Sequence, residues 1–457
     1  MLTITTNPSC KREKQYSVQV LNHWLEKECF QLQFADIPNT LIHASFTTQS
    51  RCIELPDLIL SKSTPTNLTV SEVIHLNLSL PFRKNPSPIK SFAIPREFIT
   101  SKADCRESVD GNIYIAIDLL GLIWFQLSLA EESNDKNLDL HGRHLSTSNW
   151  LGREQLLHRP ILDEWVDLFF DIVRHVFPTE SLTPRRFLPM QVSHDIDVPF
   201  KYRTFSVQEF LRKIVSEARF SRSLTKTLDL ASQMLQVQLR QAEDPFFIFP
   251  QLLDFLDELD LHSDFYFLAG GKDKRFDCPD YLNSRLIRDL IREIESRGHN
   301  IGIHFSYSSF DDEAQMEDEL LRLQKTVRRQ ITHSRQHYLR WSSLESPRRL
   351  QALGICFDST LTYADHAGFR CGTSKSFPLF DLKNRKALEV FEFPLVAMEV
   401  SLLDANYMNL NPSEALAKLL LLKSAAISFG GGFSILWHNN RLSENWQWEV
   451  FRRALQA

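Results

Sequence analysis

The chain has 457 residues, of which 43% are hydrophobic and 24% charged, and its net charge is −5. This length exceeds that of most single domains, so two domains are the expectation. The negative charge and the dispersed basic residues do not indicate a nucleic-acid partner, and no apolar stretch approaches the roughly 20 residues of a membrane span.

The cysteine content and the amino terminus bear on cellular location. Seven scattered cysteines without a Cys-x-x-Cys motif argue against a disulfide framework and against a cysteine-based zinc site. The first residues lack the basic-then-apolar order of a signal peptide. The sequence therefore predicts a cytoplasmic protein.

The first 180 residues contain short apolar runs separated by prolines and polar turns. The alternating runs Tyr16–Val20 and Val73–Leu80 predict strands, and the prolines of residues 81–90 predict a loop. The run Ile113–Leu129 begins like a strand and continues like a buried helix, and Pro160–Phe177 has helical spacing with proline at its start. We expect residues 1–180 to form an α+β accessory domain without recognisable chemistry.

Two histidine-containing segments in this region, His141–His144 and His158–Pro160, could supply ligands. Polar loop residues that pack against the next domain are the commoner meaning of such segments. We therefore interpret both of them as loops.

After residue 180, strand-like and helix-like runs alternate. The predicted strands are Leu188–Ser193, Ser263–Leu268, Asn300–His304, Gln336–Trp341, Ile355–Thr360, Ala387–Pro394 and Gly432–Trp437. The predicted helices are Phe249–Leu259, Tyr281–Ser296, Asp311–Arg329, Ser346–Leu353, Asn411–Ile427 and Leu442–Leu455, with an additional helical segment at Ser206–Gln241. This alternation predicts parallel pairing, and seven repeats fit a barrel better than a small open sheet.

The end of the first of these strands carries two acids, Asp195 and Asp197. Side chains two residues apart on a strand point to the same side, so the two carboxylates repel each other unless a cation, a proton or water lies between them. Taken alone, Asp-x-Asp more often marks an acidic turn after a strand. In parallel barrels, however, the chemistry lies where strands end. His304 and His438 fall at the ends of other predicted strands, and Arg335 lies around the fourth.

These motifs, in this order, resemble those of the polysaccharide deacetylases of carbohydrate esterase family four. The matching segments are Ser193–Asp197, Gly298–His304, Arg335–Tyr338 and Phe433–His438. The resemblance implies that residues 186–457 form a distorted seven-stranded (β/α) barrel. The whole chain is similar to a bacterial subgroup with an N-terminal domain of undefined role, in which Arg335–Tyr338, Gly368–Thr373 and Trp437–Asn439 recur.

The resemblance also implies a role for each matching residue. Asp195 would be the general base, oriented by Arg335, and His438 would be the general acid. Asp197 and His304 would bind a divalent metal, most plausibly Zn²⁺. The family's second metal histidine corresponds to Ser308, and a serine is a poor zinc ligand.

A third ligand must therefore come from elsewhere in this sequence. His337 stands where the family has proline and could supply an imidazole, although it could equally be a hydrogen-bonded core residue. His194 is an alternative, but the period of a strand points it away from both acids.

The implied activity is the metal-dependent removal of an N-acetyl group from a sugar or glycan precursor. Tyr338 and Trp437 offer faces for a sugar ring, although packing is the commoner role for a tryptophan in a strand. Asp365 and Arg370 lie in a polar loop that could contact substrate. Two alternatives remain: a catalytically silent carbohydrate-binding or scaffold protein, and an amide hydrolase with a non-sugar substrate.

Overall fold

A computed structural model of the chain describes most of its residues. The described residues are 2–35, 41–45, 52–60, 68–76, 91–100, 105–108, 110–179, 182–187, 190–203, 207–277 and 281–456. The loop predicted at residues 81–90 and the second half of the strand predicted at Val73–Leu80 lie outside them. Among the helices of the described ranges, none combines the length and the apolar character that crossing a membrane requires.

The amino-terminal region is built on a mixed sheet of six strands in the order β2-β1-β3-β4-β8-β7. The strands are β1 (Leu2–Thr6), β2 (Phe30–Phe34), β3 (Leu41–Ser45), β4 (Cys52–Pro56), β7 (Cys105–Glu107) and β8 (Ile113–Ile115). A separate antiparallel pair consists of β5 (Val73–Leu76) and β6 (Phe92–Pro95). Helices α2 (Leu119–Leu127) and α4 (Ile161–Val176) confirm two predictions for this region, and α3 (Trp150–Arg153) is a short addition.

The strand predicted at Tyr16–Val20 is wrong, because these residues lie in helix α1 (Lys11–His23). Tyr16 and Val20 are both buried, and they are four residues apart, which places them on one face of a helix. A run of only five residues is compatible with the period of a strand and with that of a helix. The longer helical pattern around this run therefore decides its structure.

The second region is built on a large sheet in the order β14-β15-β13-β12-β11-β10-β9-β17-β16. Its strands are β9 (Met190–Ile196), β10 (Ser263–Leu268), β11 (Asn300–Phe305), β12 (His333–Gln336), β13 (Phe357–Asp358), β14 (Phe377–Asp381), β15 (Lys386–Glu392), β16 (Ala397–Met398) and β17 (Phe433–Leu436). Neighbouring strands are parallel except for β14 and β15. The predicted α/β class with a parallel sheet is confirmed.

The sheet differs from the predicted seven-stranded barrel in two respects. It has two further strands, β14 and β16, and no ladder joins these two ends of the order within the described part of the chain. Strand β16 has only two residues, which is too short to show a period. Strand β14 contains Pro378, a residue that argues against a strand except at an edge, where β14 lies.

The fourth predicted strand was placed too late in the chain. Strand β12 ends at Gln336, and the next residues form a short 3₁₀ turn, His337–Leu339. Tyr338 and Leu339 have φ values of 62° and 57°, a left-handed conformation that no strand contains. This turn lifts His337 and Tyr338 out of the sheet at its carboxyl edge.

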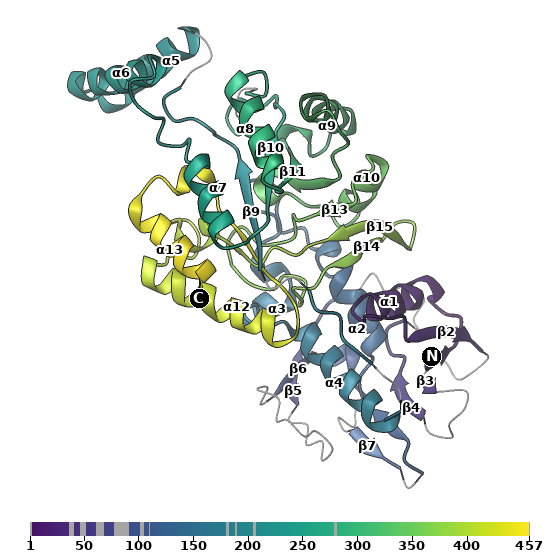
Figure 1. The fold of residues 1–457 in the computed structure, drawn as a ribbon. Coiled ribbons are helices and arrows are strands. Elements are labelled where there is room, and N and C mark those ends of the chain that lie inside the picture. The colour runs from purple at the N-terminus through teal and green to yellow at the C-terminus, as the bar shows by residue number, and fades with distance from the viewer. Residues whose placement is uncertain are drawn as a thin grey trace.

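Helices flank this sheet, as Figure 1 shows. They are α7 (Phe249–Glu258), α8 (Arg285–Ser296), α9 (Glu313–Val327), α10 (Ser346–Ala352), α12 (Pro412–Ser428) and α13 (Asn445–Gln456), and they confirm the predicted helices within a few residues. A short helix, α11 (Glu399–Leu403), follows β16. Helices α5 (Val207–Ser221) and α6 (Leu224–Gln238) extend away from the body (Figure 1).

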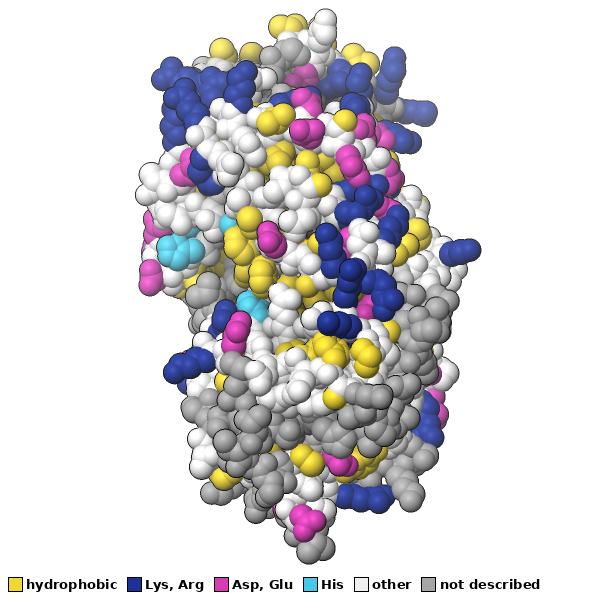
Figure 2. Space-filling model, turned by 90° about the vertical axis from the view of Figure 1, so that its right-hand side faces the viewer, with side chains coloured by type: hydrophobic (Ala, Val, Ile, Leu, Met, Phe, Trp, Pro, Cys, Tyr) yellow, Lys and Arg dark blue, Asp and Glu magenta, His cyan; other side chains and the backbone are white. Residues whose placement is uncertain are grey.

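The two regions pack against each other through buried contacts. Tyr16 Oη donates a hydrogen bond of 2.9 Å to the backbone oxygen of Pro378, and Trp24 Nε1 donates one of 2.9 Å to that of Ser376. On the face that Figure 2 shows, Lys and Arg side chains gather at the upper left and again right of centre, with Asp and Glu side chains among those on the right.

A buried ion pair also joins the two regions. Arg370 Nη2 lies 2.5 Å from Glu132 Oε2, and the two side chains are 3% and 0% exposed. Burial by itself would raise the pKa of Glu132, but Arg370 holds that pKa below its ordinary value. The charge of Glu132 therefore depends on its partner.

Replacing Arg370 by methionine should lower the free energy of unfolding by about 3 kcal/mol, because it leaves Glu132 buried without a counter-ion. The double variant Glu132→Leu, Arg370→Met should recover part of this loss. Chemical denaturation measures the free energy of unfolding of both variants. The control is Arg452→Ala, which removes an ion pair whose side chains are 45% and 48% exposed, and it should cost less than about 1 kcal/mol. Equal losses for Arg370→Met and Arg452→Ala would contradict the expectation.

Candidate active site

The carboxyl ends of the parallel strands open into a cavity of about 680 Å³. Asp195 and Asp197 reach it from the end of β9, His304 from β11, His337 from the turn after β12, and His438 from the segment after β17. Because these strands are parallel, all five side chains come to the same edge of the sheet. The structure thus brings together the residues that the sequence singles out as reactive.

Asp195 is fixed by Arg335, and both side chains are buried. Arg335 Nη1 donates to Asp195 Oδ1 over 2.8 Å. The guanidinium group also donates to the backbone oxygen and the hydroxyl of Ser359, over 2.8 and 2.9 Å, and to Ser193 Oγ over 3.0 Å. Its plane lies over the ring of Tyr266, 4.4 Å from the centroid. Arg335 is therefore rigid, and one oxygen of Asp195 is held in place.

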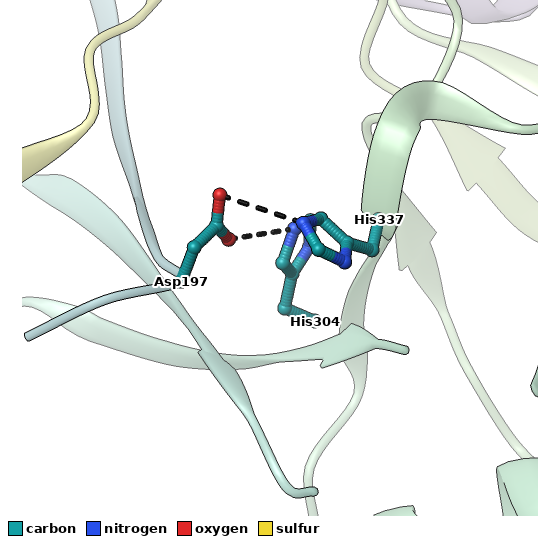
Figure 3. Close-up of side chains that lie close together, drawn as sticks. All are labelled: Asp197, His304 and His337. Atoms are coloured by element: carbon teal, nitrogen blue, oxygen red, sulfur yellow. Dashed lines mark ion pairs between the residues drawn. The ribbon is translucent and has the colours of Figure 1, made fainter. Parts of the chain in front are cut away.

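Asp197, His304 and His337 form a group that could hold a metal ion. One potential ligand atom from each lies within 4.8 Å of the other two. His304 Nε2 is 3.2 Å from Asp197 Oδ1, and His337 Nε2 is 3.5 Å from Asp197 Oδ2. Figure 3 shows both imidazole rings turned toward the carboxylate.

The other nitrogen of each imidazole is engaged away from this group. His304 Nδ1 lies 3.0 Å from the backbone oxygen of Arg335, and His337 Nδ1 lies 3.4 Å from Asp277 Oδ1. In each ring, Nδ1 is therefore directed at an oxygen atom outside the group, and Nε2 is the nitrogen that faces Asp197 and could bind a metal. Metal-binding histidines in proteins are commonly held in this way by a carbonyl or a carboxylate.

Ser308 does not contribute a ligand, but it supports one. Its hydroxyl donates to Asp277 Oδ2 over 2.9 Å, and the Asp277 carboxylate also accepts from the backbone N–H of Tyr307 over 2.7 Å. Asp277 is thereby oriented toward His337. Of positions 308 and 337, only His337 belongs to the group that could hold a metal ion.

The residues present fit a divalent ion such as Zn²⁺. Tetrahedral bonds of about 2.0–2.1 Å place neighbouring ligand atoms about 3.3 Å apart, close to the separations seen here. Asp197 Oδ1 is buried, and its contact is with His304 Nε2, the atom that would share a metal ion with it. Two imidazoles and one carboxylate also make up a common set of three protein ligands in catalytic zinc sites.

The charges around this group favour positive ions. Burial by itself would raise the pKa of Asp197, but His337, His304 and His438 hold it well below its ordinary value. Conversely, burial by itself would lower the pKa of His337, while Asp197 and Asp277 raise it to about 9. Asp197 and Asp277 therefore stabilise positive charge at His337.

His438 is oriented by an acid that the sequence did not reveal. Its Nδ1 lies 2.6 Å from Glu399 Oε1, and its Nε2 lies 3.4 Å from Asp197 Oδ2. Burial would lower the pKa of His438, but Glu399 and then Asp197 raise it to about 10. Glu399 follows directly after β16, so only the shortness of that strand hid it.

Asp277, His141 and Arg143 also line the cavity. Asp277 lies in the segment between β10 and α8, nine residues after β10 ends, so its place in the chain does not mark it as a strand-end residue. His141 and Arg143 come from the amino-terminal region, in a segment interpreted from the sequence as a loop. Arg143 donates to the backbone oxygen of Tyr338 over 3.1 Å and to the hydroxyl of Tyr407 over 3.0 Å.

Of the four residues expected to bind substrate, only Tyr338 lines the cavity. Trp437 is fully buried, and its Nε1 donates to the backbone oxygen of Arg441 over 3.0 Å. Asp365 accepts from the backbone N–H and hydroxyl of Ser146, over 3.0 and 2.7 Å. Arg370 is paired with Glu132 inside the protein. The structure does not bring these three to the site, because each is committed to packing or to joining the two regions.

His194 does not reach the metal group either. Its Nδ1 lies 2.7 Å from the backbone oxygen of Trp437, and its ring packs against Phe265 with centroids 5.0 Å apart. Burial lowers the pKa of His194 to about 4, so it is a neutral histidine of the core. The alternation of side chains along β9 accounts for this.

Comparisons with known proteins give one family match and several structural similarities. Residues 2–178 match a family of unknown function, DUF7033. No curated protein matches the chain. Among solved structures, the chain is similar to a protein from Mycobacterium smegmatis that is provisionally assigned as a polysaccharide deacetylase, with 16% identity, a TM-score of 0.38, and coverage of 60% of this chain and 88% of that one.

Two further solved structures are similar at a comparable level. A polysaccharide deacetylase from Bacillus cereus shares 11% identity at a TM-score of 0.30, over 60% of this chain and 86% of that one. An allantoinase shares 11% identity at a TM-score of 0.34, over 50% of this chain and 69% of that one. Similarities this distant decide nothing about the reaction, so the functional proposal rests on the side chains of the cavity.

Removing a ligand should remove the metal. We expect Asp197→Asn, His304→Ala and His337→Ala each to weaken Zn²⁺ binding by at least about tenfold, and Asp277→Asn to weaken it by about 10–100-fold through the orientation of His337. Competition with a chromogenic chelator measures the affinities. The control is His262→Ala, which removes an exposed imidazole just before β10, at the opposite edge of the sheet. Unchanged binding by His337→Ala would exclude it as a ligand.

Proposed function

We propose that the chain is a metal-dependent hydrolase that removes an N-acetyl group from a sugar or glycan precursor. The observation that carries this proposal is the arrangement around one cavity of three potential metal ligands, a carboxylate held by arginine and a histidine held by glutamate. A protein that only binds carbohydrate has no need for both a fixed base and a fixed acid.

Hydrolysis of an acetamide requires three things of the site. Water must lose a proton as its oxygen bonds to the carbonyl carbon, the carbonyl oxygen must be stabilised as it gains charge, and the nitrogen must gain a proton as the C–N bond breaks. A divalent ion held by Asp197, His304 and His337 would lower the pKa of a water molecule and polarise the carbonyl group.

Asp195 is the proposed proton acceptor. Its Oδ1 is held by Arg335, and its Oδ2 lies 3.6 Å from His304 Nε2, so this carboxylate borders the ligand group. The contact with Arg335 limits the rotation of Asp195 and places a fixed positive charge beside it. A carboxylate held in this way is ready to accept a proton without reorganising.

His438 is the proposed proton donor. The contact between Nδ1 and Glu399 turns Nε2 toward the cavity, beside Asp197 and on the opposite side of β9 from Arg335. A donor on one side and an acceptor on the other can serve the two proton transfers of a single hydrolysis. The products would be acetate and a free amine.

Tyr338 and two further rings form one wall of the cavity, where a sugar ring could lie. The ring of His141 is centred 4.6 Å from that of Tyr338, and the ring of Phe276 is centred 5.4 Å from it. These three replace Trp437, Asp365 and Arg370 as the proposed substrate contacts. Aromatic faces suit the apolar face of a sugar.

The proposal is tested by acetate release from a panel of N-acetyl sugars, nucleotide sugars and lipid-linked precursors, with the protein loaded with Zn²⁺. Release from at least one sugar, abolished by a chelator, is the expected result. Release from non-sugar acetamides alone would favour a different amide hydrolase. A protein that binds glycans but releases no acetate would be a binding protein.

The variant Asp195→Asn should lower kcat by at least about 100-fold, because an amide cannot accept the proton from water. Its zinc content should equal that of the wild type, since Asp195 is not in the ligand group. The control is Asp264→Asn, a change at the amino-terminal end of β10. Turnover of Asp195→Asn at the wild-type rate would mean that the acid pair is structural.

The variant His438→Ala should slow the cleavage of different substrates to different extents, depending on their leaving group. Cleavage of an N-acetyl sugar should slow by about 100-fold, because the amine leaves poorly without a proton. Cleavage of an activated aryl acetate should slow much less, because a phenolate leaves without one. Parallel kinetics on the two substrates measure the difference, and equal slowing of both would contradict a role as general acid.

A further inference from the structure

The helices α5 and α6 form a hairpin that is joined by two residues and stands apart from the body (Figure 1). No residue of α5 is buried, and α6 buries only Met234 and Val237. Little of the hairpin's surface is therefore covered by the rest of the chain.

This hairpin carries an unusual share of exposed apolar side chains. Half of the sixteen large hydrophobic residues that are exposed in the described chain lie in it: Val207, Leu211, Val215, Phe220, Leu224, Leu228, Leu235 and Leu239. Phe220 is 91% exposed. Exposed apolar residues gathered on one element usually mark a contact surface.

The spacing of these residues places them on one face. Val207, Leu211 and Val215 are four residues apart along α5, and Leu224, Leu228, Leu235 and Leu239 follow one line along α6. In each helix, the residues of this exposed line come one position after the half-buried residues that face the other helix, which is a rotation of about a third of a turn. Because the two helices are antiparallel and the rotation is the same in both, the two exposed lines lie on the same face of the hairpin.

Basic residues accompany this face. Residues 207–241 contain six basic and three acidic side chains, although the whole chain has a net charge of −5. The basic residues are Arg212, Lys213, Arg219, Arg222, Lys226 and Arg240. An exposed apolar stripe with Lys and Arg beside it is the pattern of helices that lie in the interface of a membrane.

We propose that the α5–α6 hairpin docks on a membrane surface that contains anionic phospholipids. The leucine, valine and phenylalanine side chains of the stripe enter the region between headgroups and acyl chains, and the flanking arginines and lysines contact phosphate groups. A second copy of the chain fits this face less well, because it would bring two basic hairpins together.

The hairpin also borders the cavity. Glu209, Arg212 and Lys213 from the first half of α5 line it, and Arg203 lines it from the segment before α5. The first half of α5 therefore lies beside the cavity mouth. This placement does not depend on which reaction the cavity performs.

Sedimentation with vesicles tests the proposal. The full chain should sediment with vesicles of phosphatidylcholine and phosphatidylglycerol in a 3:1 ratio, and far less with phosphatidylcholine alone. Leu211→Asp and Leu228→Asp should each lower the partition coefficient by at least about tenfold, and Arg219→Glu should lower it to a similar extent on anionic vesicles. All three side chains are exposed, so thermal unfolding should be unchanged.

The matched controls are Leu321→Asp on α9 and Leu421→Asp on α12, which alter leucines that are 56% and 51% exposed. Their binding to vesicles should equal that of the wild type. No binding of the wild type to anionic vesicles, or equal loss in controls and hairpin variants, would overturn the proposal. A dimer in analytical ultracentrifugation that Leu228→Asp converts to a monomer would also overturn it, since a second copy would then cover the face.

Discussion

Two negative charges at the end of one strand are the constraint on which the rest of the site depends. Asp195 and Asp197 share one side of β9, and the sheet buries much of both. Each charge must be balanced nearby, because an uncompensated buried carboxylate is costly. Asp195 is balanced by Arg335 from β12, while Asp197 faces three histidines. The different partners give two similar side chains different chemistry: one can accept a proton, and the other can hold a cation.

The sequence was sufficient to predict the features that depend on the local pattern of apolar and polar residues. The bounds of β10 and most helices followed from period and from capping residues, and the side on which Asp195, Asp197 and His304 meet followed from the rule that parallel strands end together. The sequence was insufficient where an element has too few residues to show a period, or where a conformation depends on residues far away in the chain. Strand β16 has two residues, so Glu399 after it could not be recognised as a strand-end acid. The turn after β12 depends on left-handed Tyr338 and Leu339, which nothing in their residue types predicts.

The support of His337 shows how one potential ligand depends on a chain of contacts. Ser308 is not among the potential ligands, but its hydroxyl orients Asp277, which in turn contacts the imidazole of His337. The sequence alone left His337 open between a ligand and a core residue, because the choice depends on Asp277, sixty positions away. Such a relation between distant residues is visible only in the folded chain.

The contact between Arg143 and the turn at Tyr338 has a consequence for the cavity wall. The reacting groups all come from strand ends of the second region, but His141 and Arg143 in the cavity wall come from the first. The cavity wall is thus built by both regions of the chain, with His141 and Arg143 from the first and Phe276 and Tyr338 from the second. A change in the short loop at residues 139–144 would reshape this wall while leaving Asp195 and Asp197 untouched. The amino-terminal region is in this sense a part of the cavity wall that can vary on its own.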